Sequence, residues 1–412
     1  MTHRRRFLIT TLLVPIAAIG VYVISIARHS ARADSGNALR APLAVPILYN
    51  EAHIRDDDIV FYTRRMREDP GSALDRSALA GLLFARSRNT GSAADLAKAE
   101  KLARQSIGIR VESNGQTYEL LASVLTARHA FREARVVAAQ ADSAEPDTPS
   151  HLALLGEIEL ELGAYDDAAA HFKAIHFDSQ QFTIGARLAR WYELTGRIDI
   201  ARQFLTRAID RVSNRDDLPR EQVAWFHYRL GELELRAGQL NAADSAFQQA
   251  LIVHEDDVRA LGGLARVALA RGAWRRAVDL GERATALQLD AGTLGTVSAA
   301  YVALRDSAQA ASFANAMMVS AREQPGTMHR AWGMFLLDHG SSAQRKMVLT
   351  RARRDLMVRN DVYGQDLLAW AMYRTGQLDD ARAMMTKAMS QHTQDVLFTT
   401  HARAIGVEIP IG

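Results

Sequence analysis

The chain has 412 residues and a formal net charge of +3, from 50 basic and 47 acidic side chains. Five of the arginines lie in residues 1–33, so the rest of the chain carries 45 basic (50 − 5) against 47 acidic side chains, a net charge of −2. The positive charge therefore belongs to the N-terminal segment and gives no support to a nucleic-acid-binding role. The absence of cysteine from the sequence excludes thiol nucleophiles and cysteine-rich zinc sites.

Residues 1–33 are predicted to be a membrane-targeting segment. An uncharged, mostly apolar run covers 7–26, about the ~20 residues that span a bilayer, and three consecutive arginines precede it as a cytoplasmic flank. We expect a single-pass signal anchor in the inner membrane of a bacterial-type cell, with the C-terminal domain outside the cytoplasm. The alternative is a signal peptide cleaved at Ala33, at the end of the string ARA. Cleavage would leave a periplasmic or secreted protein.

Residues 34–55 are predicted to be a linker, because the segment carries two prolines and shows no helical period. A short helix is expected over 56–71, since three aspartates begin it and Pro70 lies just past its end. We expect this helix to cover the first unit of a repeat array.

The repeat array is predicted from glycines that recur through residues 72–390. These are Gly163, Gly196, Gly238, Gly272, Gly340 and Gly376, with most steps near 34 residues. Around each glycine, a small residue stands seven positions before, an alanine usually five after and a large apolar residue usually nine after. Glycine can end a helix in a left-handed conformation, and small residues let two helices approach closely. The period therefore predicts consecutive helical hairpins.

Two steps of the ladder lack a glycine. His129 and Asp306 stand at these positions, the latter with Ala299 and Ala311 at the small positions of its unit. We expect both residues to replace the turn glycine, which makes the array continuous. A further departure is Gly281, which stands where the large apolar residue is expected.

These recurring positions resemble the tetratricopeptide repeat (TPR) family. The segments LLGEIELELGAYDDAAAHF and LAWAMYRTGQLDDARAMM are similar to its consensus, and the resemblance covers about three quarters of the chain. It implies an all-α fold, a right-handed superhelical solenoid of about eight to nine helix-turn-helix units that each pack on their neighbours. The first of these units extends from about Ser72 to Ile107 and has a lengthened turn.

Two segments depart from the regular step. Between Gly196 and Gly238 the interval is 42 residues, and the extra residues fall within 211–222. We interpret them either as a tolerated surface loop or as a contact loop beside a binding groove. Residues 391–412 are predicted to form a capping helix and a tail, because the last unit of a solenoid has no neighbour to cover its outer face.

The sequence holds no recognised catalytic pattern. It has no G-x-x-x-x-G-K-[ST] phosphate loop, no G-x-S-x-G elbow and no H-E-x-x-H zinc motif. We therefore expect a protein without enzymatic activity, cofactor or metal.

The family resemblance also implies a binding surface, because similar arrays take extended peptides or partner helices on the concave face, which the first helix of each unit lines. The repeat frame places these candidate partner-binding residues there: Arg190, Glu193, Trp225, Tyr228, Glu232, Arg236, Arg259, Arg266, Trp370, Tyr373 and Arg374. Aromatic and arginine side chains often carry binding energy at interfaces. Alternatively, Trp225 and Tyr228 pack against the insertion, and Trp370 belongs partly to the core.

Taken together, these features predict a non-enzymatic interaction scaffold of the cell envelope. It would bind a protein partner on its concave face and would not bind nucleic acid. The alternatives are a cleaved, soluble periplasmic or secreted binding protein, and an accessory subunit of an envelope enzyme or export complex.

Overall fold

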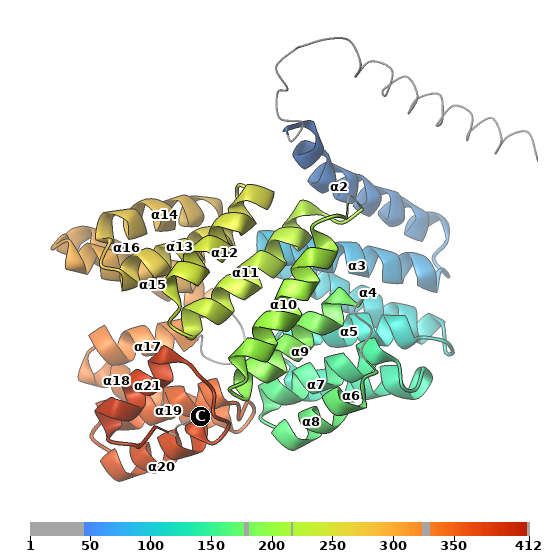
Figure 1. The fold of residues 1–412 in the computed structure, drawn as a ribbon. Helices are drawn as coiled ribbons and strands as arrows, with labels where there is room; N and C mark the ends of the chain where they lie inside the picture. The colour runs from blue at the N-terminus through green and yellow to red at the C-terminus, as the bar shows by residue number, and fades with distance from the viewer. Residues whose placement is uncertain (1–44, 177–180, 216, 324–329, 410–412) are drawn as a thin grey trace, which may run out of the picture. The chain divides into compact units, whose positions relative to one another are not determined.

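The computed structural model describes residues 45–176, 181–215, 217–323 and 330–409. The chain divides into two units, residues 1–50 and 51–412, and the repeats lie in the second. The described part of the chain is built of α-helices and contains no β-strand (Figure 1). The helices from α3 to α20 pair in sequence order and form nine consecutive hairpins.

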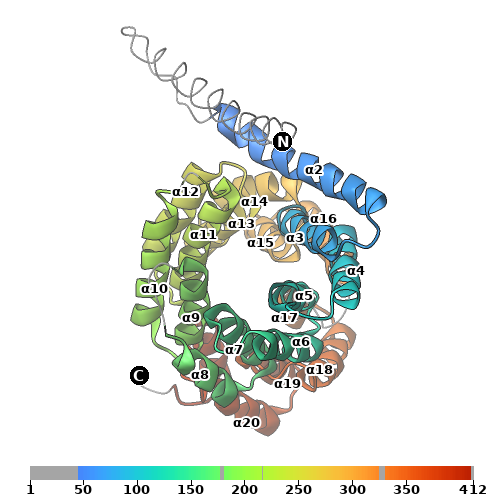
Figure 2. The same cartoon turned by 90° about the vertical axis from the view of Figure 1, so that its right-hand side faces the viewer.

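Each hairpin is one repeat of the solenoid. The first helices are α3 (Ala73–Thr90), α5 (Gly115–Ala127), α7 (Pro149–Leu162), α9 (Phe182–Leu194), α11 (Arg220–Arg236), α13 (Val258–Ala270), α15 (Ala291–Ala303), α17 (Arg330–His339) and α19 (Val362–Arg374). The second helices are α4 (Ala93–Ile109), α6 (Phe131–Ala144), α8 (Tyr165–Ala174), α10 (Ile198–Val212), α12 (Leu240–Val253), α14 (Trp274–Leu287), α16 (Ser307–Glu323), α18 (Ser342–Leu356) and α20 (Leu378–Met389). In Figure 2, α9 and α11 lie on the inner side of the coil and α10 and α12 on its outer side. The predicted fold class, an all-α superhelical solenoid of TPR-like hairpins, is confirmed.

The turn between the two helices of a repeat depends on a residue in the left-handed region. Gly163 and Gly238 have φ values of 75° and 77°, which residues with a Cβ rarely adopt. His129 takes the same conformation, with φ of 58°, as expected for the residue that replaces a turn glycine. Gly340 differs from the other ladder glycines in the described chain, since its φ is not positive.

The prediction for Asp306 was wrong by one position. The left-handed residue is Arg305, with φ of 63°, whereas the Asp306 carboxylate accepts a hydrogen bond of 3.0 Å from the backbone N–H of Gln309 at the start of α16. The small positions shift with it, because Ser298 and Ala310 are buried and the Ser298 hydroxyl donates to the Ala310 carbonyl at 2.9 Å. An aspartate suits a helix start better than a left-handed turn, because its side chain can cap a free N–H.

Small residues of two neighbouring repeats make room for one aromatic ring. A Cβ added to Gly231 or to Gly263 would lie 2.5 Å or 2.6 Å from the ring of Phe247, which is buried. The ring therefore fills the space between α11, α12 and α13 because both glycines lack a side chain. At Gly281, the side chain of Val297 from the next repeat fills the position beside the glycine and would lie 2.3 Å from an added Cβ.

Helix α2 (Val45–Glu68) precedes the first repeat and is longer than the helix expected over 56–71. The end of the expected linker, 45–55, is thus helical, and Pro46 falls in the first turn, where proline is tolerated. The predicted membrane segment, 7–26, lies outside the described residues. Among the helices that the structure describes, none has the length and apolar character that crossing a bilayer needs.

The insertion within 211–222 is partly helical and contacts α2. Helix α11 begins at Arg220, whose backbone N–H donates to the Glu51 carboxylate at 2.8 Å. Beside it, Arg55 forms an ion pair of 2.7 Å with Glu221, and both side chains are largely buried. The insertion therefore holds the N-terminal helix against the fifth repeat.

The superhelix also brings the third and fourth repeats next to the last part of the array. The backbone N–H of Val362 donates to the Tyr165 hydroxyl at 2.9 Å, and the Thr393 hydroxyl donates to the Leu194 carbonyl at 2.6 Å. The last helix, α21 (Val396–Ile405), lies in the segment expected to cap the array and packs on α19 and α20. These contacts place the inner faces of distant repeats next to one another.

Candidate functional site

The inner face of the superhelix carries a connected set of ion pairs. Glu193 on α9 contacts Arg190 at 3.1 Å, Arg229 at 3.3 Å and Arg236 at 2.6 Å. Arg236 also contacts Glu232 at 3.0 Å, and Glu232 pairs in turn with Arg266 on α13. Neighbouring first helices place these side chains together because each repeat presents the same inner positions to the next. Five of the predicted partner-binding residues belong to this ion-pair network: Arg190, Glu193, Glu232, Arg236 and Arg266.

The two carboxylates of the network are buried, with exposed fractions of 3% each. Burial alone would raise the pKa of Glu193, but the charges of Arg190, Arg236 and Arg229 outweigh it and lower the pKa below its ordinary value. The pKa of Glu232 is lowered in the same way, by Arg266 and Arg236 against the effect of burial. Both groups are therefore ionised and already paired inside the protein.

Tyr363, from α19, joins the network from a distant repeat and was not predicted from the sequence. Its hydroxyl accepts a hydrogen bond of 3.4 Å from Arg190. The guanidinium carbons of Arg190 and Arg330 each lie 5.1 Å from the ring centroid, and that of Arg236 lies at 5.8 Å. The sequence around Tyr363 does not indicate that this tyrosine contacts the network, because its arginine partners come from other superhelical turns.

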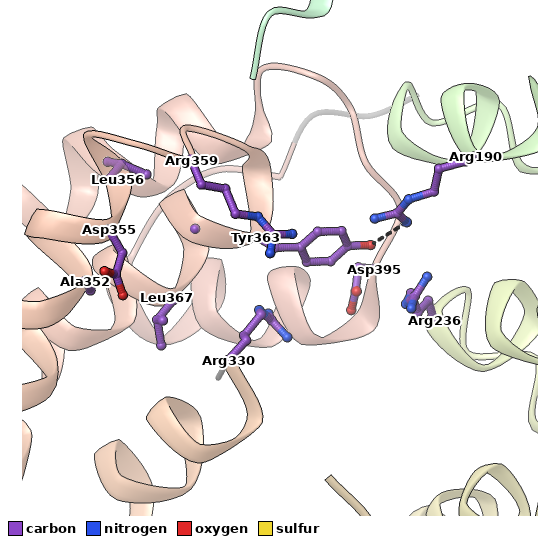
Figure 3. A pocket seen from close by; sticks show the side chains of 11 residues that line it. Arg190, Arg236, Arg330, Ala352, Asp355, Leu356, Arg359, Tyr363, Leu367 and Asp395 are labelled. Carbon is purple, nitrogen blue, oxygen red and sulfur yellow. Dashed lines mark hydrogen bonds between the residues drawn. The ribbon is translucent and has the colours of Figure 1, made fainter. Parts of the chain in front are cut away.

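A cavity of about 260 Å³ opens beside Tyr363 (Figure 3). Its charged lining consists of Arg190, Arg236, Arg330, Arg359, Asp355 and Asp395. The arginines come from α9, α11, α17 and the turn before α19, so the cavity exists only where two turns of the superhelix meet. Burial raises the pKa of Asp395, although Arg330 and Arg236 act against this shift.

A larger groove, of about 680 Å³, lies along the inner sides of α11, α13, α15 and α17. Gly262, Gly292 and Gly295 contribute to its lining, and side chains of Thr293 and Met317 fill the space beside Gly262 and Gly295, where they would lie 2.6 Å and 2.9 Å from an added Cβ. The larger apolar side chains that line it are Val258, Leu269, Met317, Met334, Phe335 and Leu397. Three predicted partner-binding residues, Tyr228, Arg259 and Arg266, line this groove as well.

The remaining predicted residues lie elsewhere. Trp225 packs edge-on against Phe226, with ring centroids 4.9 Å apart, and belongs to neither lining. Near the C-terminus, the Trp370 indole donates to Asp338 at 3.0 Å, and Arg374 contacts the same carboxylate at 2.8 Å. Trp370 is buried and stacks on the Tyr373 ring, with centroids 5.0 Å apart. These three residues form a packed cluster beside the groove.

Metal ligands do not gather anywhere in the described ranges, where no group of three or more histidine, cysteine, aspartate or glutamate side chains is placed to hold an ion. The cavity and the groove present guanidinium groups, aromatic rings and apolar surface. This chemistry suits the binding of a partner, through packing and charge.

Comparison with known proteins shows similarity in fold only. No protein-family model matches it, and no curated protein matches it by sequence. Among solved structures, the human IFIT1 dimer with m7Gppp-AAAA is similar over 78% of this chain and 72% of that chain, with a TM-score of 0.53 and 14% identity. PilW, described as a widely conserved type IV pilus biogenesis factor, matches 55% of this chain and 99% of its own, with a TM-score of 0.43 and 16% identity. A TPR protein of Thermus thermophilus matches 45% of this chain and 100% of its own, with a TM-score of 0.36 and 25% identity.

Proposed function

We propose that the protein is a non-enzymatic interaction scaffold that binds an extended segment of a protein partner in the groove along α11, α13, α15 and α17. The observation that carries this proposal is the groove itself. Its volume of about 680 Å³ lies within the range of about 300–1,000 Å³ typical of binding sites. It lies on the inner face of the first helices, the surface that the repeat frame predicts for binding.

The lining of the groove defines the partner segment. Leu269, Met334 and Phe335 offer apolar surface for the side chains of a bound segment. Arg259, Arg266 and Arg330 line the groove together with Asp290 and Asp338, a formal excess of one positive charge. We therefore expect an extended segment with small apolar side chains and an acidic residue, held by packing and by charge.

A peptide-display selection on the detergent-solubilised full-length chain tests this proposal. The expected result is an enriched family of apolar, acidic peptides whose binding is lost in Val258→Glu, because the new carboxylate enters an apolar part of the groove and repels acidic ligands. Val319→Glu is the matched control, since Val319 is 54% exposed on α16. Binding that survives Val258→Glu, or that both variants abolish equally, would place the peptide site elsewhere.

We also propose that residues 7–26 hold this scaffold in the inner membrane with the repeats outside the cytoplasm. The support is the 20-residue apolar run behind three arginines. Intact-mass measurement of the protein purified from membranes tests it. An intact N-terminal segment supports the anchor, whereas a mature chain that starts at Asp34 shows a cleaved signal peptide.

A further inference from the structure

We propose that the cavity beside Tyr363 binds a small multivalent oxyanion, carrying phosphate or carboxylate groups. The cavity is a separate site from the larger groove, although Arg330 lines both. At about 260 Å³, the cavity is slightly smaller than the range of about 300–1,000 Å³ usual for drug-sized ligands. A ligand of the size of pyrophosphate or citrate therefore suits it better than a peptide does.

Charge is the first argument for an anion. Four arginines and two aspartates line the cavity, a formal excess of two positive charges among the lining residues. The carboxylates that pair with these arginines stand outside the lining: Glu193 for Arg190 and Arg236, Glu232 for Arg236, Asp366 for Arg330, and Glu161 and Asp361 for Arg359. An anion in the cavity would thus face four guanidinium groups against the two carboxylates of Asp355 and Asp395.

Hydrogen-bonding capacity is the second argument. A guanidinium group has five N–H donors in a planar fork that matches the oxygens of carboxylate and phosphate groups. The Nε of Arg330 is buried and has no hydrogen-bond partner, a state that costs about 1–3 kcal/mol. Arg330 lies at the cavity with Arg190 on the opposite side of the Tyr363 ring (Figure 3). An oxyanion in the cavity would supply the acceptor that the Nε of Arg330 lacks.

The origin of the lining residues is the third argument, and it predicts a measurable consequence. Arg190 and Arg236 belong to the fourth and fifth repeats, whereas Arg330, Arg359 and Tyr363 belong to the last part of the array. An anion that contacts both groups at once would be bound only by the folded, closed superhelix. Binding would therefore raise the unfolding temperature in proportion to the logarithm of ligand concentration.

The experiment is calorimetric titration and thermal unfolding of the full-length chain in detergent with sodium pyrophosphate and with sodium citrate. Sodium chloride at matched ionic strength is the reference. Saturable binding of either probe, with a rise in unfolding temperature above the chloride reference, is expected. Tighter binding of pyrophosphate identifies a phosphate ligand, and tighter binding of citrate identifies a carboxylate ligand. Absence of saturable binding by both probes would overturn the proposal.

Variants then locate the site. Arg190→Gln and Arg330→Gln should each weaken binding by about tenfold or more, as expected when a charge-assisted contact is lost. Both can fold, because Glu193 keeps Arg229 and Arg236, and Asp366 keeps His401 at 2.6 Å. Arg266→Gln is the matched control, since Arg266 belongs to the same ion-pair network but not to the cavity lining. An equal loss of affinity in the control, or unchanged affinity in both cavity variants, would refute the assignment.

Discussion

The guanidinium of Arg190 donates a hydrogen bond of 3.4 Å to the hydroxyl of Tyr363, a residue 173 positions later in the chain. This contact joins the fourth repeat to the ninth, and three arginines face the same ring. Cations over an aromatic face are attracted by its quadrupole, the more strongly when solvent is excluded. Tyr363 therefore links the ninth repeat to earlier repeats through its ring more than through its hydroxyl.

This relationship predicts different effects for two substitutions of Tyr363. Tyr363→Phe keeps the ring and should destabilise the protein by only about 1 kcal/mol, the usual net contribution of one hydrogen bond. Tyr363→Ala removes the ring and should cost about 3–5 kcal/mol, as for other large aromatic truncations in a core. Chemical unfolding curves measure both values. Equal losses would show that the ring does not act as the link between the repeats.

The fit of Phe247 against two glycines predicts an overpacking effect. Gly231→Ala should destabilise by about 1–3 kcal/mol, because the new methyl would lie 2.5 Å from the Phe247 ring. Adding Phe247→Leu to the same chain should recover part of this loss. The control is Gly81→Ala in α3, where an added Cβ meets nothing within 4 Å. That change should stabilise the helix by up to about 1 kcal/mol.

The turn before α16 predicts opposite effects at adjacent positions. Arg305→Gly should stabilise the protein by about 1 kcal/mol, because it relieves a left-handed conformation that disfavours a side chain. Asp306→Gly should not stabilise it, since the substitution removes the hydrogen bond to the N–H of Gln309. Thermal unfolding of the two variants decides between them. A gain at position 306 without one at 305 would contradict the turn geometry.

The buried carboxylate of Glu193 predicts a specific acid sensitivity. Its folded-state pKa lies below the ordinary value of 4.5, so its ion pairs contribute fully above that pH. The contribution falls as the pH drops from about 4.5 toward the lowered pKa, because protons then bind the unfolded chain more readily. Glu193→Gln should lower stability at pH 7 by about 3 kcal/mol and should flatten the loss of stability below pH 4.5.

Glu133→Gln provides the comparison for this pH dependence. Glu133 pairs with Arg104 at the surface, where its side chain is 51% exposed, and such pairs contribute about 0–1 kcal/mol. From pH 3 to pH 7, the unfolding temperature of Glu133→Gln should change with pH in the same way as that of the unmodified protein. If Glu193→Gln also retained the full acid-induced loss, other carboxylates would be responsible for it.

The helical repeats were predictable because their determinants are local. The turn at Gly163 requires one residue in a left-handed conformation, and the packing of Phe247 requires small residues at fixed distances along the chain. Such requirements recur with the repeat and appear as a period in the sequence. The error at Asp306 arose because a fixed step of 34 residues cannot register a shift of one position, whereas an aspartate at a helix start has its own chemical preference.

The inner face was predictable only in part. The repeat frame correctly placed Arg190, Glu193, Glu232, Arg236 and Arg266 on neighbouring first helices, but it gave no indication that Glu193 and Glu232 would be buried and paired. It also missed Tyr363, which contacts Arg190, and Arg359, which lines the cavity, because both residues come from another superhelical turn. Their positions depend on how far each repeat rotates against the next, a small angle that accumulates over the whole array.

The sequence by itself determined the class of fold, the number of repeats to within one, and the turns that separate their helices, since each depends on neighbours along the chain. Only the tertiary structure decided which inner surfaces remain open. It closes the network of Glu193 and Glu232 with arginines, leaves the groove along α13 and α15 hollow, and forms the cavity beside Tyr363. The physical reason is that these features depend on how side chains of different repeats meet, and the cavity joins residues as far apart in the chain as Arg190 and Tyr363, which are separated by 173 positions.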